Sequence, residues 1–333
     1  MIRLALLSLV ASAALPAAIS AAALDGPRLA FPLACVTGRS CEVQAAVDDD
    51  PGPGWKDYRC GGHTYDKHTG IDIRLPDLAA QRKGVEVLAA AAGTVLRLRD
   101  GVADQMLTGP PSSAVSAQGC GNAVVVDTGG GWLTSYCHLA QGSPKVKVGD
   151  RIAVGQPIAR VGLSGETAFP HLHFEVRHNG ALVDPFAPDL APGACDASRA
   201  AGDGLWTPAA AQALAYKRGV VLNVGFSGGP VSQEDIEQAS LAAAGPAAAV
   251  LVAYVRVLNL EAGDVQELVV KDPAGVIVAQ AKLAPLDRAK AAYWLFTGAK
   301  RPAEGWRSGT YAATYSVTRG GAVAISRTFS TRL

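Results

Sequence analysis

A succession of short apolar segments between residues 84 and 178 constrains the fold of this chain more than any other feature. Each segment is rich in β-branched residues and is bounded by Gly, Pro or Asp, a pattern typical of β-strands. The segments are VEVLAA, GTVLRLR, NAVVVDT, WLTSYCHL, KVKVGDRIAV, PIARVGLS and HLHFEVR. Their regular spacing predicts a mainly β fold built on an antiparallel sheet.

The rest of the chain predicts a second β domain. Residues 191–207 are rich in Pro, Ala and Gly, which favours a linker. Beyond them, runs such as VLVAYVRVLNL and the alternating TYAATYSV predict a C-terminal β-sandwich over residues 208–333, with an alanine-rich helix at 208–216. The first domain would then cover residues 24–190, and its motifs lie within a core at 60–188.

The first residues are typical of a secretory signal peptide. Residues 1–23 have a positive start at Arg3, an apolar run and a small-residue cleavage site. Pro16 and the short run argue against an uncleaved membrane anchor. We therefore expect a secreted, periplasmic protein with no stable membrane insertion after signal cleavage. The 30 Lys and Arg nearly balance the 29 Asp and Glu, which excludes a basic surface for nucleic acid.

The six cysteines also fit an oxidising compartment. If Thr128 and Gly129 form a two-residue turn, Cys120 and Cys137 face each other across a hairpin, within disulfide reach. Cys35 and Cys41 are close enough in sequence to close a small local loop. Elimination then leaves the pair Cys60–Cys195.

Three short motifs contain most of the histidines: HTGID at 68–72, YCHL at 136–139 and FPHLHFEV at 169–176. Side chains two apart on a strand leave the same face, so His171 and His173 should point the same way. By the same alternation, Tyr136 should share the face of His138, and Cys137 should point away.

These residue types suit a zinc site. Imidazoles with one carboxylate are a common zinc ligand set, and three protein ligands leave a fourth position open for water. Two neutral histidines and one aspartate leave a net positive charge, which favours polarisation of a carbonyl and activation of water. Calcium and magnesium prefer sites made of oxygen alone. The spacing by itself does not decide which histidines bind the ion and which act beside it.

In this order, HxGxD, YxHL and HLHFE resemble the lysostaphin-type (LytM-like) zinc endopeptidases of peptidoglycan. The resemblance covers about residues 60–188 and implies a compact antiparallel β domain with one Zn²⁺ ion in a groove. The metal ligands that it implies are His68, Asp72 and His173, and the catalytic residues are His138 and His171. The chain has no HExxH helix, which excludes the helical mechanism with a glutamate base.

The resemblance implies a secreted zinc endopeptidase that hydrolyses amide bonds in peptidoglycan cross-links, with peptide stems as its binding partners. The bond cut could follow a D-alanine or lie in a glycine bridge. An alternative is a non-hydrolytic module that binds the cell wall or activates an amidase. The polar insertion between Arg99 and Gly119, or the C-terminal domain, could also cover the groove and make the enzyme latent. A third possibility is a structural domain that zinc stabilises.

Overall fold

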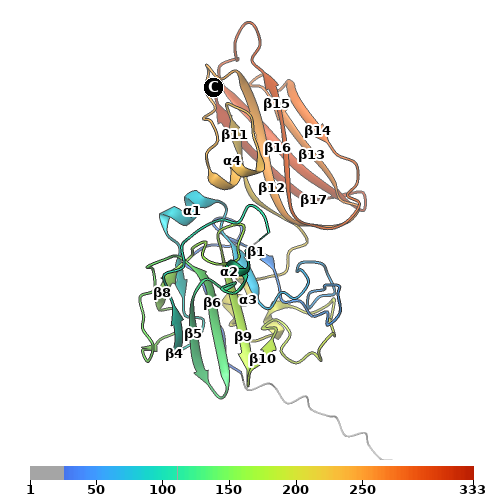
Figure 1. The fold of residues 1–333 in the computed structure, drawn as a ribbon. Coiled ribbons are helices and arrows are strands. Elements are labelled where there is room, and N and C mark those ends of the chain that lie inside the picture. Colours follow the sequence, from blue (N-terminus) through green and yellow to red (C-terminus); the bar gives the residue numbers. More distant parts are fainter. Residues whose placement is uncertain (1–25, 111) are drawn as a thin grey trace, which may run out of the picture.

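A computed structural model describes residues 26–110 and 112–333. The predicted signal peptide at 1–23 lies outside the described residues. Strands dominate the fold, and all pairs of named strands are antiparallel, which confirms the predicted mainly β class (Figure 1). Among the described helices, none is long and apolar enough to cross a membrane.

The predicted motifs lie on an eight-stranded sheet of order β1-β2-β9-β6-β5-β4-β7, in which β10 also pairs with β9. Its strands are β1 (Glu42–Ala45), β2 (Ile71–Arg74), β4 (Gly93–Arg99), β5 (Asn122–Gly129), β6 (Trp132–Leu139), β7 (Arg151–Ile152), β9 (His171–His178) and β10 (Ala181–Val183). A smaller sheet pairs β3 (Glu86–Leu88) with β8 (Pro157–Arg160). The predicted run KVKVGDRIAV forms strand only at β7, because a turn from Lys147 to Asp150, with Gly149 at a positive φ, interrupts it.

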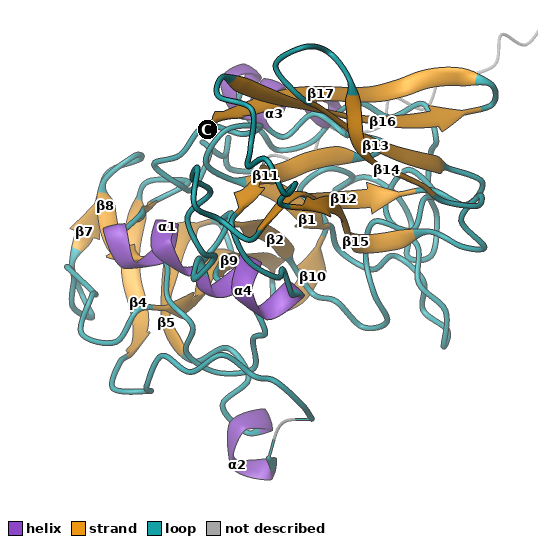
Figure 2. Ribbon diagram, turned by 90° about the horizontal axis from the view of Figure 1, so that it is seen from above, coloured by secondary structure: helices purple, strands orange, loops and turns teal. Residues whose placement is uncertain are grey.

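One face of the large sheet is buried against the core. Alternate residues of its central strands, such as Ile71, Val126, Tyr136 and Phe174, are almost fully buried. Short helices lie outside the sheet: α1 (Leu78–Lys83) follows β2, and α2 (Ser113–Ser116) lies in the polar insertion. In Figure 2, α2 projects away from the sheets. Because one face of the sheet forms the core, the polar residues of the motifs lie on the opposite face.

The C-terminal part is a β-sandwich, as predicted. One sheet has the order β11 (Val220–Ser227), β12 (Val250–Leu260) and β15 (Lys290–Lys300). The other has the order β14 (Ile277–Lys282), β13 (Val265–Lys271), β16 (Thr310–Arg319) and β17 (Ala322–Arg332). Their facing side chains, among them Val255, Leu268 and Tyr315, form one core. Helix α4 (Gln233–Gln238) connects β11 to β12.

The segment predicted as a linker packs against the first core. Leu205 and Trp206 are buried there, and the Trp206 ring lies 5.5 Å from that of Phe186 and 5.8 Å from that of Phe174. Helix α3 (Pro208–Ala213) follows and is shorter than the predicted helix. Two large apolar side chains thus anchor a stretch whose composition alone favours a loose connection.

All three predicted disulfides form, at Cys35–Cys41, Cys60–Cys195 and Cys120–Cys137. The turn predicted for the third was wrong. Gly129 pairs with Trp132, so the β5–β6 hairpin turns at Gly130 and Gly131. Cys120 precedes β5, and a left-handed residue, Gly121, redirects the chain between them. The bond therefore joins a loop to β6 and does not cross the ladder as a facing pair.

Loss of Cys60–Cys195 should destabilise the protein most among these bonds. The two cysteines are 135 residues apart, whereas Cys35 and Cys41 are 6 apart. A longer closed loop restricts the unfolded chain more. We expect the double serine variant at Cys60 and Cys195 to lose about 3–5 kcal/mol of unfolding free energy, against about 2 kcal/mol for the short loop. Urea denaturation of both variants checks this, and equal losses would contradict it.

Candidate metal centre and active site

Three predicted ligands converge at the edge between β2 and β9. Asp72 and His173 are directly paired across the two strands, and His68 precedes β2. Oδ1 of Asp72 lies 3.1 Å from Nε2 of His68 and 3.0 Å from Nδ1 of His173, and the two nitrogens are 3.1 Å apart. Ligands of a tetrahedral zinc ion would be separated by about 3.3–3.4 Å. The three atoms therefore fit around one ion after a small expansion.

The surroundings of His68 fix its ligand atom. Its Nδ1 donates to the carbonyl of Ala46 at 2.6 Å, which leaves the Nε2 lone pair facing Asp72. The backbone of Asp48 donates to the carbonyl of His68 and anchors the same loop.

The electrostatics of His68 and Asp72 favour a cation beside them. Burial alone would lower the pKa of His68, but the adjacent Asp72 raises it. Burial alone would also raise the pKa of Asp72, yet the neighbouring His171 and His68 hold it well below its usual range. Both shifts show that positive charge beside the Asp72 carboxylate is favourable. The donor set and the charge of Asp72 both suit a divalent cation.

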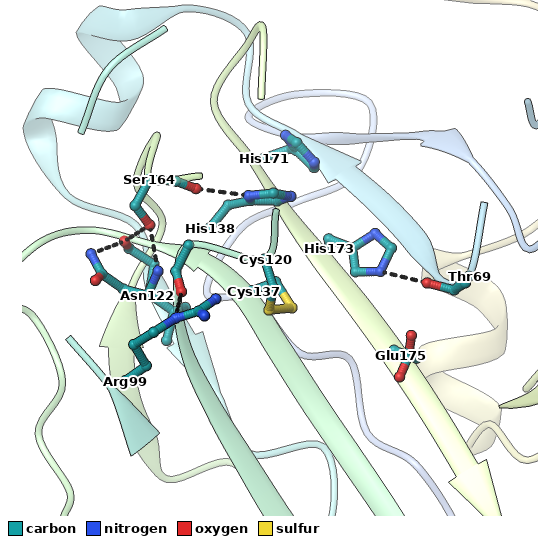
Figure 3. Close-up of a disulfide and its surroundings, with 12 residues drawn as sticks. Thr69, Arg99, Cys120, Asn122, Cys137, His138, Ser164, His171, His173 and Glu175 are labelled. Carbon is teal, nitrogen blue, oxygen red and sulfur yellow. Dashed lines mark hydrogen bonds between the residues drawn. A yellow bond between two sulfur atoms is a disulfide. The ribbon is translucent and has the colours of Figure 1, made fainter. Parts of the chain in front are cut away.

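The two other motif histidines lie beside these ligands, and backbone carbonyls hold both. His138 Nδ1 donates to the Ser164 carbonyl at 2.8 Å (Figure 3), and His171 Nδ1 donates to the Phe169 carbonyl at 2.9 Å. The two rings are 4.6 Å apart, and His171 Nε2 lies 3.4 Å from Asp72 Oδ1. Both imidazoles therefore keep Nε2 available for proton transfer.

His138 is buried and neutral at pH 7. Burial, together with the nearby His171 and His173, lowers its pKa to about 3. The structure thus brings all five predicted residues into one cluster, formed by three ligand candidates and two imidazoles that need not bind the ion.

The backbone of His138 corrects the predicted facing of YCHL. His138 has a φ of 57°, a left-handed conformation that breaks the alternation of β6. Tyr136 points into the core, where its hydroxyl accepts from the backbone of Ala90 at 2.7 Å. Cys137 pairs with His173 across the ladder and lines the groove together with His138. The expectation that Cys137 points away from the histidine was therefore wrong.

An open groove of about 410 Å³ runs past the cluster. Three motif histidines, His68, His138 and His173, line it, and the other lining residues include Tyr65, Lys67, Thr69, Val125, Ser135, Glu166 and Glu175. Tyr65 stacks on the ring of His68 at 4.3 Å, and its hydroxyl lies 3.4 Å from Oδ2 of Asp72. Sequence reasoning missed Tyr65 and Ser164. Only their place in the folded loops brings them to the site.

Gly70 is a sensitive position in this centre. A Cβ there would lie 2.6 Å from the Phe174 carbonyl oxygen and 2.7 Å from the His173 ring. Gly70→Ala should therefore displace His173 and weaken zinc binding by about 10–100-fold. Competition with a chromophoric chelator measures the affinity. Gly245→Ala is the control, because a Cβ at that position meets open space. Equal affinities in the two variants would contradict the packing argument.

A comparison with known protein families gives a match that covers the residues of this site. Residues 66–185 match peptidase family M23. The DD-carboxypeptidase/endopeptidase Mpg of Neisseria meningitidis is 33% identical over 124 residues, which are 37% of this chain and 23% of that protein. The murein hydrolase activator EnvC of Escherichia coli is 38% identical over 124 residues, 37% of this chain and 25% of that protein. The chain thus spans about a quarter of the length of these relatives.

Among solved structures, a zinc-containing peptidase from Vibrio cholerae is 25% identical, with a TM-score of 0.31, over 46% of this chain and 37% of that one. Because this structural similarity is low, the family is shown by the sequence match over residues 66–185 and by the motif residues within it. The part of this chain from residue 66 to residue 185 is a domain of peptidase family M23, the lysostaphin-type peptidases that its motifs resemble.

Proposed function

We propose that this protein is an exported, zinc-dependent endopeptidase that hydrolyses amide bonds in the peptide cross-links of peptidoglycan. The observation that carries the proposal is the completeness of the site. Three ligand atoms lie within 3.1 Å of one another, and two further imidazoles stand beside them with Nδ1 fixed by carbonyls. A module that only binds or activates has no need of the two extra histidines.

In the proposed reaction, His68, Asp72 and His173 hold the zinc ion. When bound, zinc polarises the scissile carbonyl and makes water more acidic. The donor types support this choice of metal, because two imidazole nitrogens and one carboxylate oxygen match zinc better than calcium or magnesium.

His138 and His171 would move the protons. His138 is neutral and has Nε2 free, so it can accept the proton of the attacking water. His171 Nε2 lies 3.4 Å from Asp72 Oδ1, on the side of the ring that faces the proposed metal position. When its Nε2 carries a proton, His171 can donate a hydrogen bond to the developing oxyanion and then transfer that proton to the leaving amine. The Ser164 carbonyl fixes the orientation of the His138 ring, and the Phe169 carbonyl and the Thr167 hydroxyl, 3.0 Å from Nδ1, fix that of His171.

The open groove supports an extended peptide as substrate. Its floor follows the outer face of β6 and β9, at Ser135, Cys137, His173 and Glu175, so a peptide stem can lie along the sheet and pass the cluster. Stem peptides linked through a D-alanine bond are the substrate that we propose first, and a glycine bridge is the alternative.

A peptidoglycan gel tests the proposal. The mature protein should produce a clearing zone that disappears with a chelator and returns with zinc. Mass analysis of the released muropeptides then identifies the bond. Binding to the gel without clearing in every metal condition would overturn the enzyme proposal. Clearing only after an amidase is added would instead support an activator, the role named for the EnvC relative.

A further inference from the structure

A buried group of charged side chains joins the C-terminal sandwich to β2. Glu237 on α4 uses one oxygen, Oε2, to accept from both Arg74 of β2 and Arg256 of β12. The exposed fractions of these side chains are 9%, 3% and 0% in that order. Removal of one partner from such a group is costly, because a buried charge is left without compensation. The group therefore holds α4 and β2 in one fixed arrangement.

Arg74 connects this group to the proposed active site. It is paired with His171 across the β2–β9 ladder. Its guanidinium carbon lies 4.2 Å from the centre of the Phe169 ring, a cation–π contact. Its Nη1 donates to Gln44 at 2.9 Å, and its Nη2 donates to Glu237. The orientation of the Arg74 guanidinium over the Phe169 ring thus depends on Glu237, a carboxylate from the C-terminal sandwich.

Phe169 in turn contacts His171 in two ways. The rings are 4.7 Å apart, and the Phe169 carbonyl accepts the hydrogen bond from His171 Nδ1. A shift of Phe169 would therefore change both the packing and the hydrogen bond of the imidazole. The C-terminal region also contacts the peptidase sheet elsewhere, for example where Lys217 pairs with Glu42 at 2.6 Å. Such contacts do not involve Arg74, Phe169 or His171.

We propose that Glu237, Arg74 and Phe169 are positioning residues for His171, so that the C-terminal sandwich completes the active site. The catalytic part of this inference rests on the proposed function. Misplacement of a catalytic group by about 1 Å can cost about 100-fold in rate. If the sandwich only docks onto the peptidase sheet, weakening the contact of Glu237 with Arg74 would leave the geometry of His171 unchanged.

The experiment compares four variants with the parent protein. Glu237→Gln removes the shared carboxylate charge. Glu234→Gln is the matched control, since it makes the same change at an exposed position of the same helix. Phe169→Leu removes the ring without touching Glu237, and Phe169→Tyr restores a ring. Two readouts are recorded: kcat and KM on cross-linked muropeptides, and the ¹⁵N NMR signal of His171 with its Nδ1 proton.

We expect Glu237→Gln and Phe169→Leu to lower kcat by about 10–100-fold, with KM changed less than about threefold. The His171 Nδ1 proton signal should shift or exchange away in both. Phe169→Tyr and Glu234→Gln should stay within about threefold of the parent kcat. If Glu237→Gln and Phe169→Leu fold and keep both the parent kcat and the parent His171 signal, the inference is overturned.

Two further outcomes are also decisive. If Glu237→Gln fails to fold, Phe169→Leu still tests the contact with His171. If the parent protein hydrolyses no muropeptide, the proposed function fails, and the His171 signal alone decides whether the three residues position the ring.

Discussion

Replacing His138 with alanine should lower kcat/KM for cross-link hydrolysis by about 10²–10⁴-fold, while the protein still binds one zinc ion. The reason is that His138 is not one of the three proposed ligands. The three atoms that converge on the proposed metal position belong to His68, Asp72 and His173, whereas His138 is held by Ser164 and adds a free Nε2. Rates of muropeptide release give the activity, and elemental analysis gives the zinc content.

His178→Ala is the matched control for this variant. His178 also comes from the sheet, but its ring stacks on Trp132 at 4.2 Å, away from the groove. Its loss should leave the rate within about threefold of the parent, the range of ordinary surface changes. Full activity in His138→Ala would remove this residue from the mechanism. Loss of zinc from the same variant would mean that it is a ligand.

Asp72→Asn should abolish hydrolysis and weaken zinc binding by more than about 100-fold. Asp72 is 1% exposed, and three imidazoles surround its Oδ1 at 3.0–3.4 Å. The amide keeps the volume of the side chain but removes the only negative charge among these ligands. Isothermal titration of the metal-free protein with zinc measures the affinity.

Asp66→Asn provides the comparison for Asp72. Asp66 lies in the loop before His68, and its side chain is 38% exposed and pairs with Lys67 at 3.4 Å. The same chemical change there should leave zinc affinity within about threefold. If both variants bind zinc as the parent does, Asp72 is not a ligand and the centre must be assigned again.

The sheet could be predicted from the sequence because each strand is a short apolar run or an alternation of apolar and polar residues. Both are local patterns. The resemblance of HTGID and HLHFE to a known family predicted that His68, Asp72 and His173 would meet, and they do so because Asp72 on β2 pairs with His173 on β9. The facing of YCHL was not, because the left-handed backbone of His138 depends on the loop that holds it. The predicted disulfide between Cys120 and Cys137 was correct although its hairpin turn was wrong. A disulfide can join a loop residue to a strand residue even when the two are not opposite each other in a ladder.

Contacts between distant segments account for the rest of what the sequence did not predict. The carbonyls of Ala46 and Ser164 that fix the histidine tautomers are backbone groups, which no residue pattern marks. Trp206 anchors a segment that composition assigns to a linker. The contact of Glu237 with Arg74 spans 163 positions of sequence, and nothing near either residue indicates its partner.

The bond between Cys60 and Cys195 encloses all five residues of the proposed site in one covalent ring. The exposed stretch at residues 108–110 lies inside that ring. A protease that cut there would leave two fragments still joined through sulfur, and β4 of the first fragment would remain bonded between β5 and β7 of the second. A nicked molecule could thus keep its histidines and aspartate in register, and the damage would become visible only on a reducing gel.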